Sequence, residues 1–371
     1  MSELQMQRLG MVMEPDPGNP DEVEGVLNPA AARGPDGELY LFPRMVARGN
    51  YSRIGVARVR FNEAGDPVGV DRLGIALEPE ADYERRPDGG GGCEDPRISF
   101  VEPLQCYVMT YTAYSPRGPR IALAVSDDLI QWRRAGLASF DPLAGVEFEG
   151  VDDKDASIFP VAVLDPFGRP SIAMIHRPLF PSTRPEEVAH FSPRSGVDVH
   201  HESIWISYCT VDSARADSNQ FGRFTSHHRL ASPVAPWERV KIGGGAPPVL
   251  TRHGWLVVYH GVRELDADES SDENRRLCYS AGAMILSESH PRFIRHRSPL
   301  PVLTPKLPLE CHGTIANVVF PTGIDRRDDL GTPERFDVYY GMADDRIGAA
   351  RLDVPDFLPT GAVADAPRNR I

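Results

Sequence analysis

The sequence is poor in cysteine. Five cysteines are spread widely over 371 residues, and none of them forms a Cys-x-x-Cys pair. An odd number of isolated cysteines gives no disulfide framework, and the simplest interpretation is a set of free thiols in a reducing compartment. This predicts a cytoplasmic protein. The adjacent histidine pairs, at 200–201 and 227–228, lack the spacing of metal ligands, so we expect no metal site.

Long apolar runs and an excess of positive charge are also missing. No apolar stretch approaches the roughly 20 residues of a membrane-spanning helix, and the first residues lack the apolar centre of a signal peptide. Acidic residues outnumber basic ones by 53 to 40, which gives a net charge of −13. We therefore expect neither a nucleic acid nor a membrane as a partner. A bound anion would need a local cluster of cations.

The sequence shows no regular alternation of strands with amphipathic helices, which argues against a doubly wound α/β fold. Turn formers are abundant instead, with 35 prolines and 33 glycines. One layout recurs along the chain: a polar or glycine-rich segment, called a head below, opens an apolar strand. The five heads begin at Asn28, Glu94, Lys154, Gly245 and His312.

Each head is followed by a turn and then by a strand rich in aromatic and β-branched residues. These second strands are expected at Leu39–Arg44, Tyr107–Ala113, Ile172–Pro178, Trp255–Val262 and Phe336–Asp344. A third strand follows in each unit, at 54–61, 121–126, 204–209, 279–286 and 347–352. Five such units predict an all-β fold, a five-bladed β-propeller.

We expect one domain over residues 1–355 and a loose C-terminal tail over 356–371. Polar insert loops near 180–201 and 265–276 interrupt the third and fourth blades.

A propeller brings the heads together, because the innermost strand of each blade faces a central channel. The heads should place Asn28, Asp95, Lys154, Asp155 and the loop 243–246 at one mouth of this channel. The ends of the second strands should bring Arg44, Arg177, His260 and Asp344 to the same region. Carboxylates beside lysine, arginine and histidine indicate a site for a small polar ligand.

The ordered set of heads and strand ends resembles glycoside hydrolase family 130, the β-mannoside phosphorylases and their hydrolytic relatives. The resemblance runs from about Asn28 to Leu352, and the family fold is a five-bladed propeller. The motifs that carry it are Glu94-Asp95-Pro96-Arg97, Lys154-Asp155-Ala156, His176-Arg177-Pro178, Gly244-Gly245-Ala246-Pro247-Pro248, Tyr259-His260-Gly261-Val262, Gly282-Ala283 and Asn317-Val318-Val319-Phe320.

The resemblance implies phosphorolysis of a terminal β-mannoside with inversion, giving α-mannose 1-phosphate. It implies that Asp95 is the catalytic acid, whose proton reaches the glycosidic oxygen through a hydroxyl of the bound mannose. It implies phosphate ligands at Lys154, Arg177, His260 and Tyr279, and mannose ligands at Asn28, Arg44 and Asp344. No cofactor is implied, since inorganic phosphate is a co-substrate.

The residues themselves fit this chemistry. An inverting hydrolase needs an acid and a base, whereas a phosphorylase needs an acid and a cationic cradle for the phosphate. We count Lys154, Arg177 and His260 as that cradle.

Two alternatives stay open. One is an inverting β-mannosidase in which Glu310 serves as the base, and the other is a sugar-binding propeller without turnover. The sequence leaves open the acceptor sugar, the linkage and the oligomeric state, although family members often form homo-oligomers.

Overall fold

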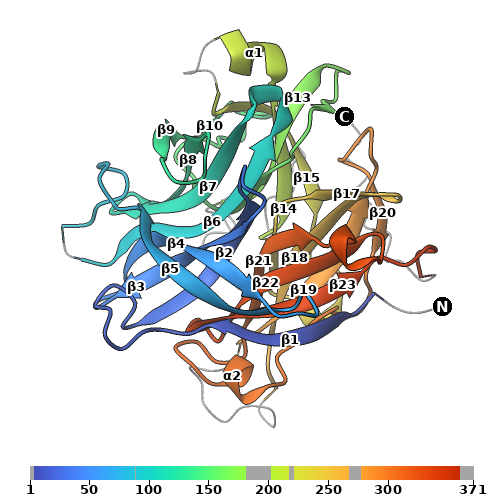
Figure 1. Cartoon of the computed structure of the whole chain (residues 1–371). Coiled ribbons are helices and arrows are strands. Elements are labelled where there is room, and N and C mark those ends of the chain that lie inside the picture. Colours follow the sequence, from blue (N-terminus) through green and yellow to red (C-terminus); the bar gives the residue numbers. More distant parts are fainter. Residues whose placement is uncertain (1–3, 88, 181–201, 217–220, 267–276, 360–371) are drawn as a thin grey trace.

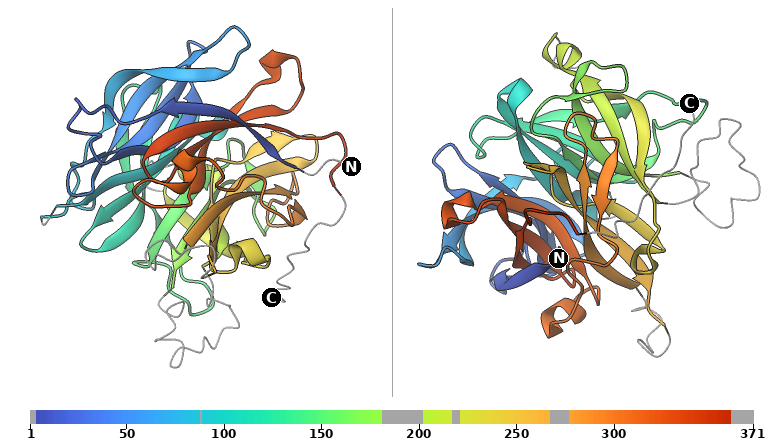
Figure 2. Two further views of the ribbon diagram at one scale, coloured as in Figure 1. Left: turned by 90° about the horizontal axis from the view of Figure 1, so that it is seen from below. Right: turned by 90° about the vertical axis from the view of Figure 1, so that its right-hand side faces the viewer.

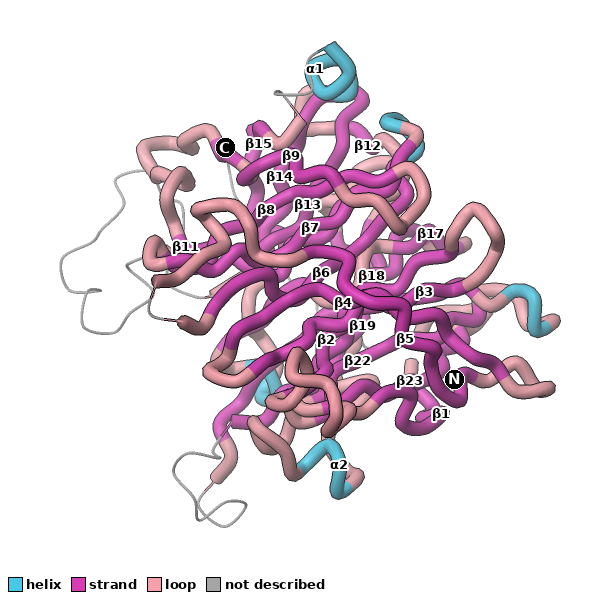
Figure 3. The backbone as a smooth tube through the Cα atoms, turned by 60° about the vertical axis from the view of Figure 1, so that its left-hand side comes forward, coloured by secondary structure: helices cyan, strands magenta, loops and turns pink. Residues whose placement is uncertain are grey.

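The computed structural model describes residues 4–87, 89–180, 202–216, 221–266 and 277–359. Strands dominate this part of the chain, and the few short helices lie at the periphery (Figure 3). They are η1 (Glu102–Leu104), α1 (Val211–Ala216), η3 (Pro236–Glu238), α2 (Pro308–Cys311) and η5 (Asp328–Leu330). No helix in the described residues is long and apolar enough to cross a membrane.

The strands form a five-bladed β-propeller, as predicted (Figure 1). Blade one contains β2 (Gly25–Arg33), β3 (Leu39–Ala47), β4 (Tyr51–Phe61) and β5 (Pro67–Leu77). Blade two contains β6 (Gly91–Val101), β7 (Cys106–Ser115), β8 (Gly118–Ser126) and β9 (Arg133–Leu137). Blade three contains β11 (Asp152–Ile158), β13 (Pro170–Leu179), β14 (Ile204–Thr210) and β15 (Arg223–Ala231), with β10 (Ser139–Phe140) and β12 (Val163–Leu164) at its edges.

Blade four has a broken inner strand. Its members are β16 (Lys241–Gly244), β17 (Val249–Thr251), β18 (Gly254–Glu264), β19 (Leu277–Leu286) and β20 (Ile294–Arg297). Both β16 and β17 pair with β18. The interruption falls at Pro247 and Pro248, which have no backbone N–H to donate to a ladder.

Blade five is built from both ends of the described chain. It contains β21 (Val319–Arg326), β22 (Arg335–Met342), β23 (Arg346–Asp353) and, as its outermost strand, β1 (Met6–Met13). The first strand runs antiparallel to the last one, with Met6 opposite Leu352 (Figure 2). This pairing closes the ring.

The core is divided among the junctions between blades. Five buried apolar clusters occur in the described residues, and each joins two neighbouring blades. The cluster between blades five and one, for example, contains Val12 of β1, Leu41 of β3 and Tyr339 of β22. The inner strands also contact one another around the centre, because β2 meets β6 and β21 while β11 meets β6 and β16.

The structure differs from the predicted units in two respects. Each blade has a fourth strand, which the sequence analysis did not predict. The inner strand of the fifth unit begins at Val319 and not in the segment from His312 to Ala316, which contains bends and no strand. Residues 181–201, 267–276 and 360–371 lie outside the described residues, so the predicted inserts and tail fall mostly there.

Candidate active site

In three blades, the inner strand contains a left-handed residue at a β-bulge near its start. Asn28, Asp95 and Asp155 adopt φ values of 45°, 47° and 58°, within the left-handed region. Each lies where the register between the inner and second strands shifts by a bulge. Asparagine and aspartate tolerate this conformation better than most residues, and bulges often redirect side chains at active sites. The repeated bulge therefore explains why polar residues recur at the heads.

These heads meet at one small cavity of about 220 Å³. All eight residues of the predicted site line it: Asn28, Arg44, Asp95, Lys154, Arg177, His260, Tyr279 and Asp344. Asp155, Lys241, Ile315, Val318 and Phe320 complete the lining. The structure thus brings together residues from all five blades.

Asp95 lies on the side of the cavity formed by blades one and two. Its Oδ1 accepts a hydrogen bond of 2.9 Å from Asn28 Nδ2 and lies 3.4 Å from Arg44 Nη1. Arg44 also donates to the buried Glu94, at 3.0 Å, and to Ser52, at 2.9 Å. The guanidinium is therefore fixed, and Asp95 is oriented by two donors from blade one.

Asp344 lies in the turn between β22 and β23 and faces the same group of charges. Burial raises the pKa of Asp344 to about 6, and the carboxylates of Asp95 and Glu94 add to this effect while Arg44 opposes it. A carboxyl group beside Asp95 is therefore protonated far more readily than an exposed aspartate.

A second group of charges surrounds Asp155 on blades three and four. Its Oδ2 lies 2.6 Å from Arg177 Nε and 3.7 Å from His260 Nε2, and its Oδ1 lies 3.5 Å from Arg97 Nη2. Burial alone would raise the pKa of Asp155, but the charges of Arg177 and its neighbours hold this pKa below its usual range. Asp155 stays a carboxylate and fixes the guanidinium of Arg177.

The charge of His260 differs from the sequence-based expectation, which counted this residue among the cations of the phosphate cradle. Burial, together with the positive charges of Arg177 and Lys241, lowers the pKa of His260 to about 3. Neither ring nitrogen has a hydrogen-bond partner among the described residues. The imidazole is therefore neutral near pH 7 and can act on a ligand in the cavity only as a hydrogen-bonding group.

Lys241 replaces His260 as the third cation. Its Nζ lies 5.7 Å from the centre of the Tyr279 ring, and burial lowers the pKa of the ammonium group. Burial also raises the pKa of the Tyr279 hydroxyl to about 12, so this group is a neutral donor. Lys241 was not predicted as a site residue, although it is the first residue of β16 in the fourth blade, two positions before Gly243, and the other heads also carry polar residues.

Glu310, the candidate base of the hydrolase alternative, does not line the cavity. It is fully buried and accepts hydrogen bonds from Arg8 Nε (2.7 Å), from the Tyr340 hydroxyl (2.9 Å) and from the backbone N–H groups of Lys306 and Leu307. Its role is structural: it links Arg8 of the outermost strand β1 to Tyr340 of β22 within blade five. The assignment of Glu310 as a base is wrong.

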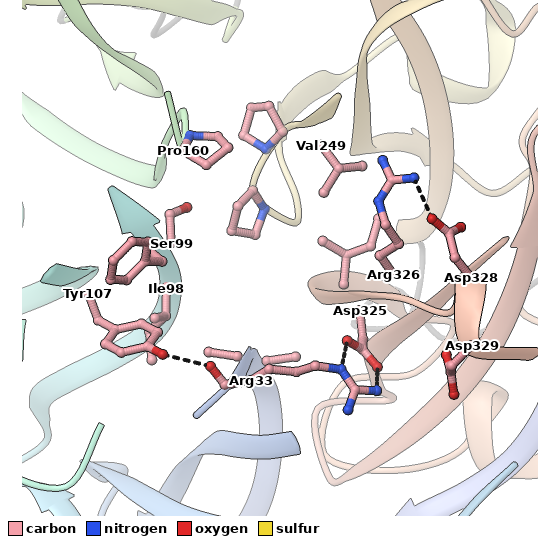
Figure 4. A pocket seen from close by; sticks show the side chains of 16 residues that line it. Arg33, Ile98, Ser99, Tyr107, Pro160, Val249, Asp325, Arg326, Asp328 and Asp329 are labelled. Atoms are coloured by element: carbon pink, nitrogen blue, oxygen red, sulfur yellow. Dashed lines mark hydrogen bonds and ion pairs between the residues drawn. The ribbon is translucent and has the colours of Figure 1, made fainter. Parts of the chain in front are cut away.

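A larger cavity of about 630 Å³ lies at the opposite end of the inner strands (Figure 4). One wall is apolar and includes Tyr107 and Pro160, and the other is charged. The charged side chains are engaged with one another: Arg33 forms a two-pronged ion pair with Asp325, at 2.8 and 2.7 Å, and Arg326 pairs with Asp328 at 3.3 Å. The smaller cavity, with its cations and oriented carboxylate, is the candidate active site.

No group of three or more histidine, cysteine, aspartate or glutamate side chains suited to a metal ion occurs in the described ranges. The chemistry available in the small cavity is that of one oriented carboxylate facing a cluster of cations and neutral donors. Such a site can bind a small anion next to a polar ligand and transfer a proton.

The fold and the cavity define a β-propeller protein with a cluster of cations beside an oriented carboxylate. The chain belongs to glycoside hydrolase family 130, because the sequence model of this family, described as beta-1,4-mannooligosaccharide phosphorylase, matches residues 6–359. It is a glycoside phosphorylase by this relationship.

Named relatives agree with this assignment. The chain is 29% identical over 353 residues to a 1,2-beta-oligomannan phosphorylase of Thermoanaerobacter sp. (strain X514), covering 93% of this chain and 96% of that protein. Over 132 residues, 36% of each chain, it is 35% identical to a beta-1,4-mannooligosaccharide phosphorylase of Ruminococcus albus.

The fold is similar to that of the beta-1,2-mannobiose phosphorylase from Listeria innocua in complex with beta-1,2-mannobiose. The TM-score is 0.66 at 21% sequence identity, over 94% of this chain and 96% of that one.

Proposed function

We propose that the protein is an inverting phosphorylase of terminal β-mannosides that releases α-mannose 1-phosphate. The observation that carries the proposal is the charge distribution of the small cavity. Arg177 and Lys241 supply positive charge on one side, Asp95 lies oriented on the other, and Lys154 adds a third cation between them.

The cations bind the phosphate in this proposal. An arginine guanidinium offers paired N–H donors to phosphate oxygens, and the neutral His260 and Tyr279 contribute directional hydrogen bonds. Lys154 lies between the two groups of charges, with Nζ 4.0 Å from Glu94 Oε2 and 5.5 Å from the centre of the Tyr114 ring.

Asp95 acts as the acid, and Asn28, Arg44 and Asp344 hold the terminal mannose. A phosphate oxygen forms the new bond to the anomeric carbon while the bond to the acceptor oxygen breaks. The proton of Asp95 passes through a mannose hydroxyl to that oxygen. Attack from the face opposite the leaving group converts the β-linkage into an α-phosphate.

The charges around Asp155 favour phosphorolysis over hydrolysis. A hydrolase needs a second carboxylate to activate water. Of the two carboxylates paired with Arg177, Asp155 is the one that lines the cavity, but its ion pair with Arg177 and its lowered pKa make it a weak base.

The experiment is incubation with β-1,2-mannobiose and β-1,4-mannobiose, each with and without inorganic phosphate, followed by ³¹P NMR. We expect α-mannose 1-phosphate with at least one disaccharide and almost no product without phosphate. Free mannose released equally fast in both buffers would establish hydrolysis and contradict the proposal.

We also propose a reducing compartment such as the cytoplasm. All five cysteines lie in the described residues, and none of them forms a disulfide there. Assembly into a homo-oligomer, and the expectation that nucleic acids and membranes are not partners, stay predictions.

A further inference from the structure

Glu202 forms an ion pair with the guanidinium that we assign to phosphate. Its Oε2 accepts from Arg177 Nη1, while the Nε of the same arginine donates to Asp155 at 2.6 Å. The backbone oxygen of Glu202 accepts a hydrogen bond of 3.2 Å from Ile242, the residue after Lys241. Glu202 is thereby held beside two of the three cations that we assign to phosphate.

The two carboxylates on Arg177 differ in burial and in their other contacts. The Asp155 side chain is 3% exposed and is shared among Arg177, Arg97 and His260. The Glu202 side chain is 24% exposed, and Arg177 is its ion-pair partner among the described residues. Asp155 is therefore the fixed carboxylate, and Glu202 is the one that can leave at a small cost.

A carboxylate and a phosphate present similar oxygen acceptors to a guanidinium, so both can use the same donors. The negative charge of Glu202 also acts on Lys241, where it opposes the lowering of the pKa by burial. A phosphate ion that enters the cavity meets Glu202 as a repulsive charge and as a competitor for Arg177.

We propose that Glu202 is an internal anion that occupies Arg177 until phosphate displaces it, and that it thereby sets the phosphate affinity of the enzyme. The inference rests on the proposed function, since it identifies the ligand of this anion site as phosphate. An opposite role would be that of a positioning residue, in which Glu202 holds Arg177 in the orientation that phosphate needs. The two roles predict opposite changes in phosphate affinity when the carboxylate of Glu202 is removed: competition predicts tighter binding, and positioning predicts weaker binding.

The test uses the full chain with Glu202→Gln and Glu202→Ala. Phosphate and sulfate binding is measured by calorimetry without sugar, and kcat and KM for phosphate and for the mannoside are measured by phosphorolysis. Competition predicts that both variants bind phosphate and sulfate on the order of tenfold more tightly, because one nearby negative charge is removed. The KM for the mannoside should stay unchanged.

The matched control is Asp71→Asn, which also removes one negative charge. Asp71 pairs with Arg58 at 3.1 Å on the outer strands of blade one, away from the cavity. It should leave anion binding unchanged, and thermal unfolding establishes that all variants are folded.

The outcomes separate the inference from the proposed function. If the enzyme performs phosphorolysis and both Glu202 variants bind anions equally or more weakly, Glu202 does not compete with phosphate for Arg177. This result would contradict the inference. Tighter anion binding without any phosphorolysis would retain the role of Glu202 at an anion site and reject the phosphorylase assignment.

Discussion

Asn28 Nδ2 donates a hydrogen bond of 2.9 Å to Asp95 Oδ1, and the two residues open the inner strands of neighbouring blades. Both adopt the left-handed conformation at a strand bulge, with φ values of 45° and 47°. The orientation of the proposed acid therefore depends on the contact between blades one and two.

Asp95→Asn should remove the proton donor and leave the cationic side of the cavity intact. We expect turnover to fall about 10²–10⁴-fold, the usual contribution of general acid catalysis. Phosphate and sulfate binding, measured by calorimetry, should stay near that of the unmodified protein. A variant with nearly full activity would exclude Asp95 from the mechanism.

Lys241→Ala tests the residue that the sequence analysis missed. Loss of a partly buried cation near Arg177 should raise the phosphate KM about 10–100-fold and change the mannoside KM little. Lys306→Ala is the matched control, because Lys306 does not line the cavity. Equal phosphate KM values in the two variants would place Lys241 outside the phosphate site.

Asp344→Asn should stabilise the protein without ligand at neutral pH. Its folded pKa of about 6 lies above the ordinary value of 3.8, so the folded state binds the proton more tightly between these values. The stability that this carboxyl contributes is present below about pH 4 and is lost as the pH rises through about 6.

The substitution removes that loss, and asparagine accepts the φ of 50° at this position. We expect a gain of about 1–3 kcal/mol in the free energy of unfolding at pH 7.5 and little change at pH 4. Thermal and urea unfolding at both pH values measure it, with Asp345→Asn as the control outside the cavity. An equal effect at both pH values would show that the titration of Asp344 is not the cause.

Glu310→Gln should weaken the structure and leave the reaction unchanged. Disruption of a buried ion pair leaves Arg8 without its counter-charge, which costs about 2–4 kcal/mol. Urea unfolding should report this loss, while kcat per folded molecule stays constant. A selective loss of turnover at unchanged stability would restore a catalytic role for Glu310.

The sequence predicted the first three strands of each blade, except for the start of the inner strand in blade five, because turns and runs of aromatic and β-branched residues define them. The outer strands β5 and β9 escaped prediction because they lack a buried apolar face, as in β5, where Leu73 and Ile75 are 50% and 40% exposed. Strand β1 escaped because its partner β23 lies at the other end of the chain. Pattern alone does not identify a partner at such a distance.

The site residues were found in the heads and strand ends, but their charge states were not. The protonation of His260 depends on burial and on Arg177, which belongs to another blade. Lys241 is followed by Ile242 and three glycines, and its place at the head of the fourth blade was the one sequence signal that connected it to the site. Only the folded structure shows that Lys241 lines the same cavity as Arg177.

The position of β1 in the last blade has a consequence for synthesis on the ribosome. Strand β1 precedes blade one in the chain and cannot find its partner until β23 has been made, so the ring stays open until the last blade is complete. The completed blades meanwhile expose the apolar edge that Val12 and Ile347 later cover together. We expect this interval to be the stage at which the nascent chain depends most on chaperones.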